Sequence, residues 1–169
     1  MDELTSYHNA DSGCELDEPL TQAIVSALED NCELIYGDFI LASNDTPSYD
    51  LLMRKFGAAT EIVGQVIVMN TELVDLGFLG SVRRISYYYF DDEIVTEKFV
   101  QVALNDKLER LKWSKLEDIS IVTVQISGNP KLCFTANEMS GLFSALEVAK
   151  MEGRVCEGKD RVSLRVFYY

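Results

Sequence analysis

The sequence contains a single histidine, His8, and no lysine or arginine before Arg54. A catalytic Ser-His-Asp or Cys-His arrangement needs an imidazole that its neighbours hold in a fixed geometry. His8 lies in a polar stretch without hydrophobic periodicity, where a fixed geometry is not expected. The same scarcity excludes zinc and iron sites built on histidine. We therefore expect a protein that is not an enzyme.

Motifs of cofactor and metal sites are also missing. Residues 77–81 lack the lysine and the spacing of a phosphate-binding P-loop, and no Gly-x-Gly sequence occurs. No EF-hand loop is present, and the acidic triplet 91–93 is typical of a solvated turn. The sequence thus predicts no cofactor and no metal site.

An export signal and a long hydrophobic run are absent as well. The chain begins Met-Asp-Glu-Leu, which is acidic where a signal peptide carries basic residues. Apolar runs such as 39–42 and 66–69 are far shorter than the roughly 20 residues that span a bilayer. We therefore expect a cytoplasmic protein with no membrane segment, in which the acceptor sequence Asn44-Asp45-Thr46 is never glycosylated.

The four cysteines, Cys14, Cys32, Cys133 and Cys156, are separated by 18, 101 and 23 residues. No two of them have the short spacing of a zinc knuckle or a redox pair. In a reducing compartment such cysteines remain free thiols. We expect free cysteines, with Cys32 and Cys133 buried beside strands.

Hydrophobic periodicity predicts α+β structure. Residues 1–16 are expected to form an acidic, disordered tail, and residues 17–169 a single globular domain. Helices are expected to begin at Asp17 and at Thr46-Pro47, to cover 106–113, and to run from a capping box of Thr135 and Glu138 to Gly153. Strands are expected over 33–42, 60–69, 82–90, 94–104, 119–126, 131–134 and 161–168.

Short turns between these strands favour an antiparallel or mixed sheet of about six to seven strands, with three to four helices packed mainly on one face. In such a fold, neighbours along the chain pair through hairpins. We find no internal repeat in the sequence, so a repeat architecture is not expected.

The net charge of −13 is concentrated in the first third of the chain. Residues 1–53 contain twelve acidic residues and no basic one, whereas the remaining residues are nearly balanced. Such asymmetry favours an acidic surface with a basic partner, although negative charge also serves solubility. The leading hypothesis is a non-catalytic, DNA-mimic-like inhibitor that captures a basic protein, such as a nuclease or another nucleic-acid-binding protein. Its candidate partner-binding residues are Glu29, Asp30, Glu33, Asp38, Asp45 and Asp50.

A second hypothesis uses the strand expected over 82–90, which combines basic and aromatic residues. Arg83, Arg84, Tyr87 and Tyr89 could hold phosphates and stack single-stranded bases. Aromatic residues in strands are more often core residues, and a negative net charge opposes nucleic acid, so this hypothesis ranks second. A third hypothesis is a structural or assembly subunit that forms a homo-oligomer through an apolar interface.

Overall fold

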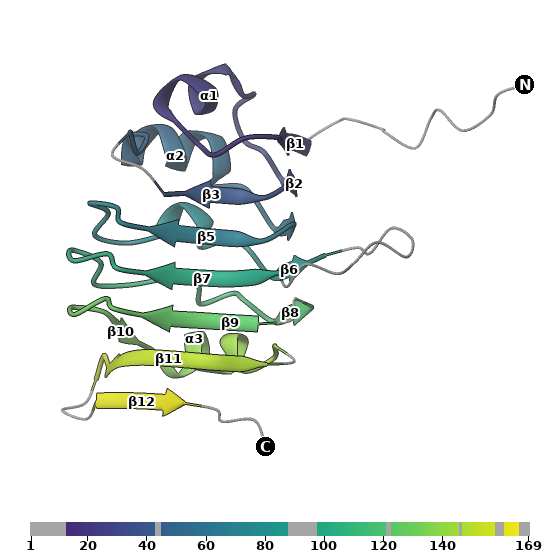
Figure 1. The fold of residues 1–169 in the computed structure, drawn as a ribbon. Coiled ribbons are helices and arrows are strands. Elements are labelled where there is room, and N and C mark those ends of the chain that lie inside the picture. The colour runs from purple at the N-terminus through teal and green to yellow at the C-terminus, as the bar shows by residue number, and fades with distance from the viewer. Residues whose placement is uncertain are drawn as a thin grey trace, which may run out of the picture.

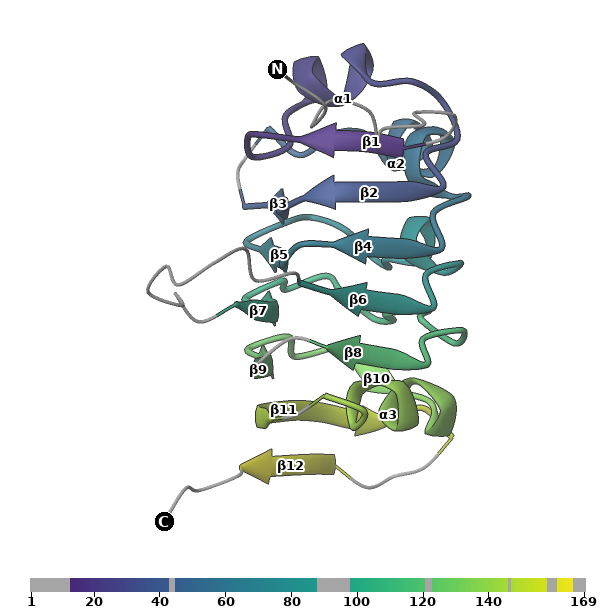
Figure 2. The ribbon, with the colours of Figure 1, turned by 90° about the vertical axis from the view of Figure 1, so that its right-hand side faces the viewer.

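The structure is a computed structural model, and we describe its residues 13–42, 45–87, 98–120, 123–145, 147–157 and 161–165. The strands wind around a common axis as a solenoid, and successive coils stack from top to bottom in Figures 1 and 2. Helices α1 and α2 close the upper end in Figure 1, and α3 lies near the lower end. The helices are α1 Gln22–Ala27, α2 Tyr49–Phe56 and α3 Ala136–Leu142, with a 3-10 helix over Gly77–Leu79.

The first sheet consists of five parallel strands and is seen broadside in Figure 2. Its order is β1-β2-β4-β6-β8, so each strand pairs with the strand of the next coil. The strands are β1 Gly13–Leu16, β2 Leu34–Gly37, β4 Glu61–Val63, β6 Arg84–Ser86 and β8 Asp118–Ser120. Residues 13–16, which the sequence assigned to a tail, therefore pair with β2 as part of the sheet.

The second sheet is seen broadside in Figure 1, where β3, β5, β7, β9 and β11 run parallel in that order. Short β10 pairs in parallel with the end of β11, and β12 pairs antiparallel with β11 at the lower edge. The strands are β3 Phe39–Leu41, β5 Val66–Met69, β7 Phe99–Ala103, β9 Thr123–Ser127, β10 Cys133–Phe134, β11 Val148–Val155 and β12 Arg161–Arg165.

The predicted antiparallel or mixed sheet, with helices packed mainly on one face, is wrong. Parallel partners need a crossover between them, and here the rest of the coil is that crossover. The chain passes from a strand of the first sheet to a strand of the second, crosses a third side and enters the next coil. Thus β2 and β3, which were expected to form one strand over 33–42, belong to different sheets.

The two sheets enclose one hydrophobic interior, because alternate residues of each strand point inward. Aligned residues of successive coils are alike, so identical side chains stack on one another. In the first sheet the stack is Ile35, Ile62, Ile85 and Ile119, and in the second it is Val66, Val100 and Val124. All seven side chains are buried. Because each coil contributes only a few residues to each sheet, the sequence shows this core as short, separate apolar strands.

A ladder of buried polar side chains runs down the corner that follows the second sheet. Asn105 Oδ1 accepts hydrogen bonds from the backbone N–H and the hydroxyl of Thr71, at 2.9 and 2.8 Å. Asn105 Nδ2 donates to Asn129 Oδ1 and to the carbonyl of Val68, both at 3.0 Å. Asn129 Nδ2 donates in the same way to the carbonyl of Val102, at 2.9 Å. The ladder fastens three successive coils and satisfies polar groups that would otherwise be costly to bury.

The ladder marks an internal repeat, so the prediction of no repeat is wrong. The residue before each rung, Asn70, Leu104 or Gly128, has a positive φ of 53°, 57° or 67°. The sequences VIVMNT (66–71), VQVALN (100–105) and VQISGN (124–129) align at these corners. Val66 pairs with Val100, 34 residues later, whereas Val100 pairs with Val124, 24 residues later. This unequal coil length hides the repeat from a search at fixed spacing.

The first two helices that the sequence predicts are both present in the structure. The helix expected to begin at Thr46-Pro47 is α2, which starts after the N-cap Ser48 and has Gly57 as its C-cap. Helix α1 begins later than expected, after the N-cap Thr21. No helix among the described residues is long and apolar enough to cross a membrane.

The third helix keeps its predicted start but not its predicted length. The capping box is confirmed, with the Thr135 N–H donating to Glu138 Oε2 at 2.7 Å. The helix ends at Leu142, and much of its predicted second half is β11 instead. Residues 106–113 form no helix, because Arg110 takes part in a column of parallel β-bridges on the third side of the solenoid.

Candidate binding surface on the second sheet

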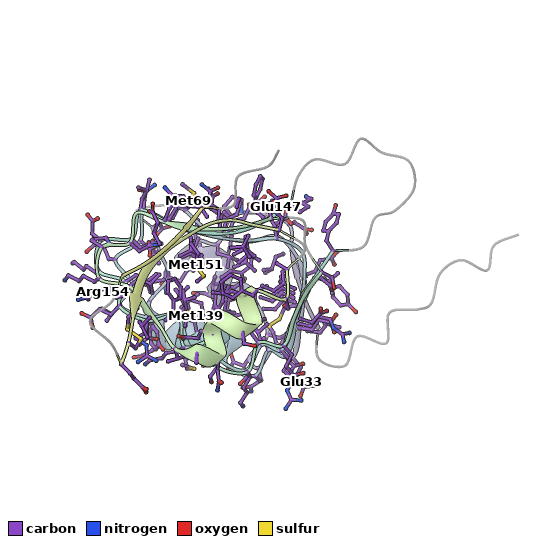
Figure 3. The ribbon with its side chains drawn as sticks, turned by 90° about the horizontal axis from the view of Figure 1, so that it is seen from below. Glu33, Met69, Met139, Glu147, Met151 and Arg154 are labelled. Carbon is purple, nitrogen blue, oxygen red and sulfur yellow. A yellow bond between two sulfur atoms is a disulfide. The ribbon has the colours of Figure 1, made fainter. Side chains whose placement is uncertain are left out.

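Four neighbouring strands of the second sheet, β3, β5, β7 and β9, contain no Asp, Glu, Lys or Arg. Ten of their 17 positions are buried, so only seven can carry exposed side chains. Because a quarter of the whole chain is charged, about two charged residues would be expected at these seven positions. We call the outward-facing side chains of these strands the uncharged face. It consists of Ile40, Ile67, Met69, Phe99, Gln101, Gln125 and Ser127, all partly exposed. In Figure 3, Met69 lies at the outer edge of the molecule and Met151 in its interior.

Side chains of the uncharged face align in a row across the strands. Strand register places Ile40 beside Ile67, Ile67 beside Gln101, and Gln101 beside Gln125. Lys150 of β11 continues the row and forms an ion pair with Glu152 at 2.9 Å. Gln101 Nε2 donates to Gln125 Oε1 at 3.4 Å. The row therefore changes from aliphatic to amide along the solenoid, with the first charge at its lower end.

A pocket borders this face where β3 and β7 begin. It has a volume of about 370 Å³ and includes Ile40, Asp38, Tyr87 and Lys98 in its lining. Lys98 Nζ lies 3.7 Å from Asp38 Oδ2 and 4.7 Å from the centre of the Tyr87 ring. Asp38 also accepts hydrogen bonds from the backbone and the side-chain amide of Gln65. Lys98 and Asp38 are thus engaged with each other, and the acids Asp17 and Glu18 also line the pocket.

The outer face of the first sheet has a different chemistry. Arg84 lies 3.5 Å from the Asp118 carboxylate, and Glu61 accepts a hydrogen bond from Ser86 at 3.2 Å. These residues stand side by side on β4, β6 and β8. Their charges keep that face hydrated, because covering a charge without an equivalent partner is unfavourable.

The third side of the solenoid carries a polar network beside α2. Asp75 accepts a hydrogen bond from the Tyr49 hydroxyl at 2.6 Å and lies 2.7 Å from Lys112 Nζ. Burial, together with the bond to Asp75, raises the pKa of Tyr49 to about 12. Burial acts to raise the pKa of Asp75, but the bonds from Lys112, Tyr49 and the Gly77 N–H outweigh it, so this pKa lies below 3.8. The network fixes α2 to the coil beneath it.

The acidic residues proposed as a partner-binding surface are found around the upper coils. Glu29 and Asp30 follow α1, and Glu33 precedes β2. A hydrogen bond from Lys55, opposed by burial and aided by the charges of Lys55 and Arg54, lowers the pKa of Asp30. Figure 3 shows Glu33 on the side of the molecule opposite Met69.

The other three proposed acids lie on different elements. Asp38 stands at the corner between β2 and β3 and is paired with Lys98. Asp45 precedes α2, and Asp50 lies in the first turn of α2, where the helix dipole favours a carboxylate. Two of the six acids, Asp30 and Asp38, are therefore held in ion pairs within the fold.

Of the residues proposed for nucleic-acid binding, the structure describes Arg83, Arg84 and Tyr87. Arg83 and Arg84 are exposed, with Arg84 on the outer face of β6. Ile85 between Arg84 and Ser86 is buried in the interior, whereas Tyr87 lies under Lys98. Tyr89 lies outside the described residues.

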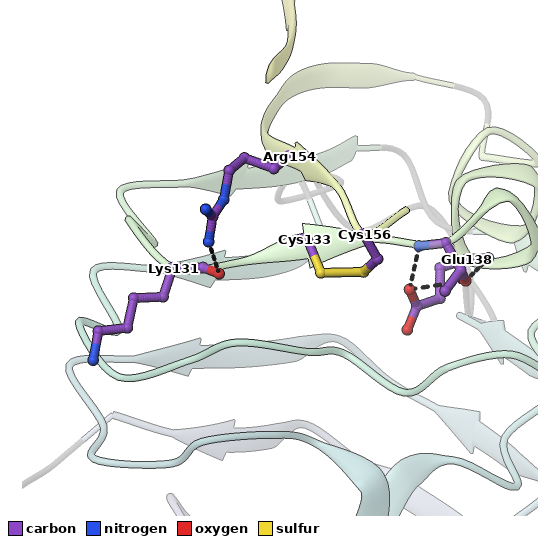
Figure 4. Close-up of a disulfide and its surroundings, with 6 residues drawn as sticks. Lys131, Cys133, Glu138, Arg154 and Cys156 are labelled. Atoms are coloured by element: carbon purple, nitrogen blue, oxygen red, sulfur yellow. Dashed lines mark hydrogen bonds between the residues drawn. A yellow bond between two sulfur atoms is a disulfide. The ribbon is translucent and has the colours of Figure 1, made fainter. Parts of the chain in front are cut away.

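All four cysteines form disulfides, so the prediction of free thiols is wrong. Cys14 of β1 is joined to Cys32, with the Cα atoms 5.5 Å apart. Cys133 is joined to Cys156, with the Cα atoms 4.9 Å apart (Figure 4). Beside this bond Arg154 donates to the carbonyl of Lys131 at 3.2 Å. Disulfides form and persist in oxidising compartments.

The uncharged face was not predicted from the sequence because the repeat was not recognised there. Once FILASN (39–44) is placed above the three repeat segments given earlier, the second position reads Ile40, Ile67, Gln101 and Gln125. The first and third positions are apolar and the last is Asn or Thr. Alternation within each segment then assigns the second position to the outer face. This alignment is the signal that could have found the surface.

Comparison with known proteins gives two findings. Residues 31–142, more than half of the chain, match the family described as Receptor L domain. The chain is also 22% identical over 153 residues to Protein irld-34 of Caenorhabditis elegans. The aligned region covers 85% of this chain but only 36% of that protein. The chain thus spans about a third of the length of this relative.

These findings overturn the functional hypotheses drawn from charge. A receptor-type domain with two disulfides is not a cytoplasmic inhibitor that mimics DNA, and its partner is not a basic nucleic-acid-binding protein. The inhibitor hypothesis was wrong because it was drawn from the charge of the first third of the chain, without knowledge of the fold. The cytoplasmic prediction is also wrong, since the family and the disulfides point to an extracellular or secreted location. The match over residues 31–142, on a solenoid of parallel sheets, shows that the chain belongs to the Receptor L domain family.

Proposed function

We propose that the chain is a ligand-recognition module of an extracellular, receptor-like protein, and that it binds a protein ligand through the uncharged face. Its role is binding rather than catalysis. The observation that carries the proposal is the absence of charge on four neighbouring strands of a chain that is one-quarter charged. The centres of protein interfaces are depleted of charged residues and enriched in aromatic residues and Met, and Phe99 and Met69 supply both here.

The energetics favour this face over the first sheet. Covering Ile40, Ile67 and Met69 removes partly exposed apolar surface from water, which contributes roughly 25 cal/mol per Å². Covering the outer face of the first sheet would instead desolvate Arg84 and Asp118. A ligand therefore gains more from the second sheet than from the first.

The size of the face indicates an interface centre rather than a whole interface. Four strands about 4.8 Å apart, each about 15 Å long, present roughly 300 Å². A stable protein interface takes about 800 Å² from each partner. The flanking residues must complete it, and Lys98 and Asp38 on one border and Lys150 on the next strand are placed to form its polar rim.

The test is a binding screen with a matched pair of variants. A multimerised form of the chain is screened against a collection of secreted proteins and cell-surface ectodomains. Ile67→Lys places a charge at the centre of the uncharged face and is expected to weaken binding of any ligand found by at least about 10-fold. Val63→Lys places the same charge on the outer face of the first sheet and is expected to leave binding unchanged.

Both variants should retain the thermal unfolding midpoint of the unmodified chain, because Ile67 and Val63 are only partly buried. Binding that survives Ile67→Lys but is lost with Val63→Lys would reject the proposal.

A further inference from the structure

We infer that Gln101 and Gln125 determine the specificity of the uncharged face, and that its ligand places an uncharged amide, from a peptide group or from Asn or Gln, against them. The inference rests on the proposed function and specifies the chemistry of the ligand at the same face. It starts from the hydrogen bond that joins the two side chains on adjacent strands.

The amide pair has unused hydrogen-bonding groups. A primary amide has two N–H donors and one carbonyl oxygen with two lone pairs. The bond from Gln101 Nε2 to Gln125 Oε1 leaves the Gln101 oxygen and the Gln125 amino group open. Within the described part of the chain, neither side chain makes another side-chain hydrogen bond. The pair therefore presents an acceptor next to a donor.

Ligand groups differ in whether they can replace the hydrogen bonds that the amide pair makes to water, and this difference selects among them. A ligand amide can donate to the Gln101 oxygen and accept from the Gln125 amino group. An aliphatic group would leave both unpaired, which is unfavourable for each group that becomes buried. A charged group would lose its hydration with no opposite charge on β3, β5, β7 or β9 to replace it.

The fold itself does not require amides at these positions. Ile40 and Ile67 occupy the same row on β3 and β5, so the backbone accepts an aliphatic side chain there. The coils are already joined by the buried ladder of Asn105 and Asn129, at the corner that follows these strands. Gln101 and Gln125 are therefore free to serve recognition.

Their neighbours limit the footprint of the amide-binding position. Ile67 lies on one side of the pair, and Lys150 on the other, where it is paired with Glu152. The ligand is thus expected to carry an aliphatic side chain next to its amide. An amide flanked by apolar groups is a feature of many uncharged peptide segments, so peptides are suitable probes.

The experiment uses a phage-displayed library of random peptides selected in parallel on the full chain and on a Gln101→Leu/Gln125→Leu double variant. Peptides selected on the full chain are expected to bind the double variant at least 10-fold more weakly, which corresponds to about 1.4 kcal/mol. They are also expected to lose binding to Ile67→Lys. Selection on the double variant should yield aliphatic residues where the first set has Asn or Gln.

The outcomes separate the inference from the proposed function. Peptides that lose binding to Ile67→Lys but bind the double variant with unchanged affinity would overturn the inference and leave the proposed function intact. A library without any binder that depends on Ile67 would overturn the proposed function as well. Unfolding in urea checks that the double variant is folded, since Gln→Leu changes at two partly exposed positions are expected to leave the urea midpoint nearly unchanged.

Discussion

The two sheets of the solenoid are built from the same interior and carry different exteriors. Inside, stacked isoleucines of the first sheet face stacked valines of the second. Outside, the first sheet presents Arg84, Asp118 and Glu61, whereas β3, β5, β7 and β9 present no charge. The interior must be apolar for the coils to stack, but the exterior is free to vary. Outer-face chemistry is therefore the better guide to what this chain binds.

Their attachments differ as well. The strands of the second sheet end in the buried ladder of Thr71, Asn105 and Asn129. The upper strand of the first sheet, β1, is tied by the disulfide between Cys14 and Cys32. Removing one attachment at a time should show which sheet each attachment stabilises. The largest loss in the free energy of unfolding is expected from the ladder.

The largest effect is expected from Asn105→Leu. This change removes the middle rung of the ladder, so the Thr71 N–H, the Thr71 hydroxyl and the Val68 carbonyl lose their bonds to the Asn105 side chain. Asn129 Oδ1 keeps the bond from the backbone N–H of residue 105. At about 1–3 kcal/mol for each unsatisfied group, the free energy of unfolding should fall by about 3–5 kcal/mol. Unfolding in urea measures the loss. Gln101→Leu on the outer side of the same strand is the control, and equal losses for the two variants would show that the ladder is not the attachment.

A smaller effect is expected when Cys14 and Cys32 are both changed to Ala. The disulfide closes a loop of 18 residues, and its removal is expected to lower the free energy of unfolding by about 3 kcal/mol. Amide hydrogen exchange should rise first in β1, while β9 and β11 remain protected. If protection in β9 falls as much as in β1, the two sheets unfold as one unit and the comparison between them fails.

The smallest effect on the free energy of unfolding is expected at alkaline pH, from Tyr49 on the third side of the solenoid. Because the folded state raises the pKa of Tyr49 to about 12, its stabilising contribution is full below pH 10, the ordinary value. That contribution is lost as the pH rises from 10 towards 12. The unmodified chain should therefore lose its stability advantage over Tyr49→Phe across this range, as measured by urea unfolding. An advantage that persists to pH 12 would contradict the assignment.

Local signals in the sequence predicted local structure. The hydrophobic spacing and the glycine stop of α2, and the capping box of Thr135 and Glu138, each involve residues within a few positions of one another. Such short-range patterns determine where a helix begins, and the structure confirms both helices. The strand expected over 60–69 was also found, although the chain turns within it and divides it into β4 and β5.

Long-range pairing could not be read in the same way. The parallel strands pair residues 21 to 34 positions apart, as Gly13 does with Leu34 and Arg84 with Asp118. Alternation within a strand gives no information about the direction of its partner. Leu108 and Leu111 have helical spacing, yet both fill the interior from the third side.

The candidate site was missed for a related physical reason. Charge is easily counted along a chain, so the acids before Arg54 dominated the interpretation. A binding surface marked by missing charge is spread over four coils and becomes visible only when those coils are aligned. The disulfides were missed because separations of 18 and 23 residues match no short metal or redox motif.

The difference in coil length has a practical consequence. Val66 to Val100 takes ten residues more than Val100 to Val124, yet all three valines stay in register. Strand pairing and the polar ladder align the coils, so the number of residues between β6 and β7 does not affect the register. A foreign peptide could accordingly be grafted between those two strands, turning the solenoid into a rigid carrier that displays an epitope while its neighbouring surface stays unaltered.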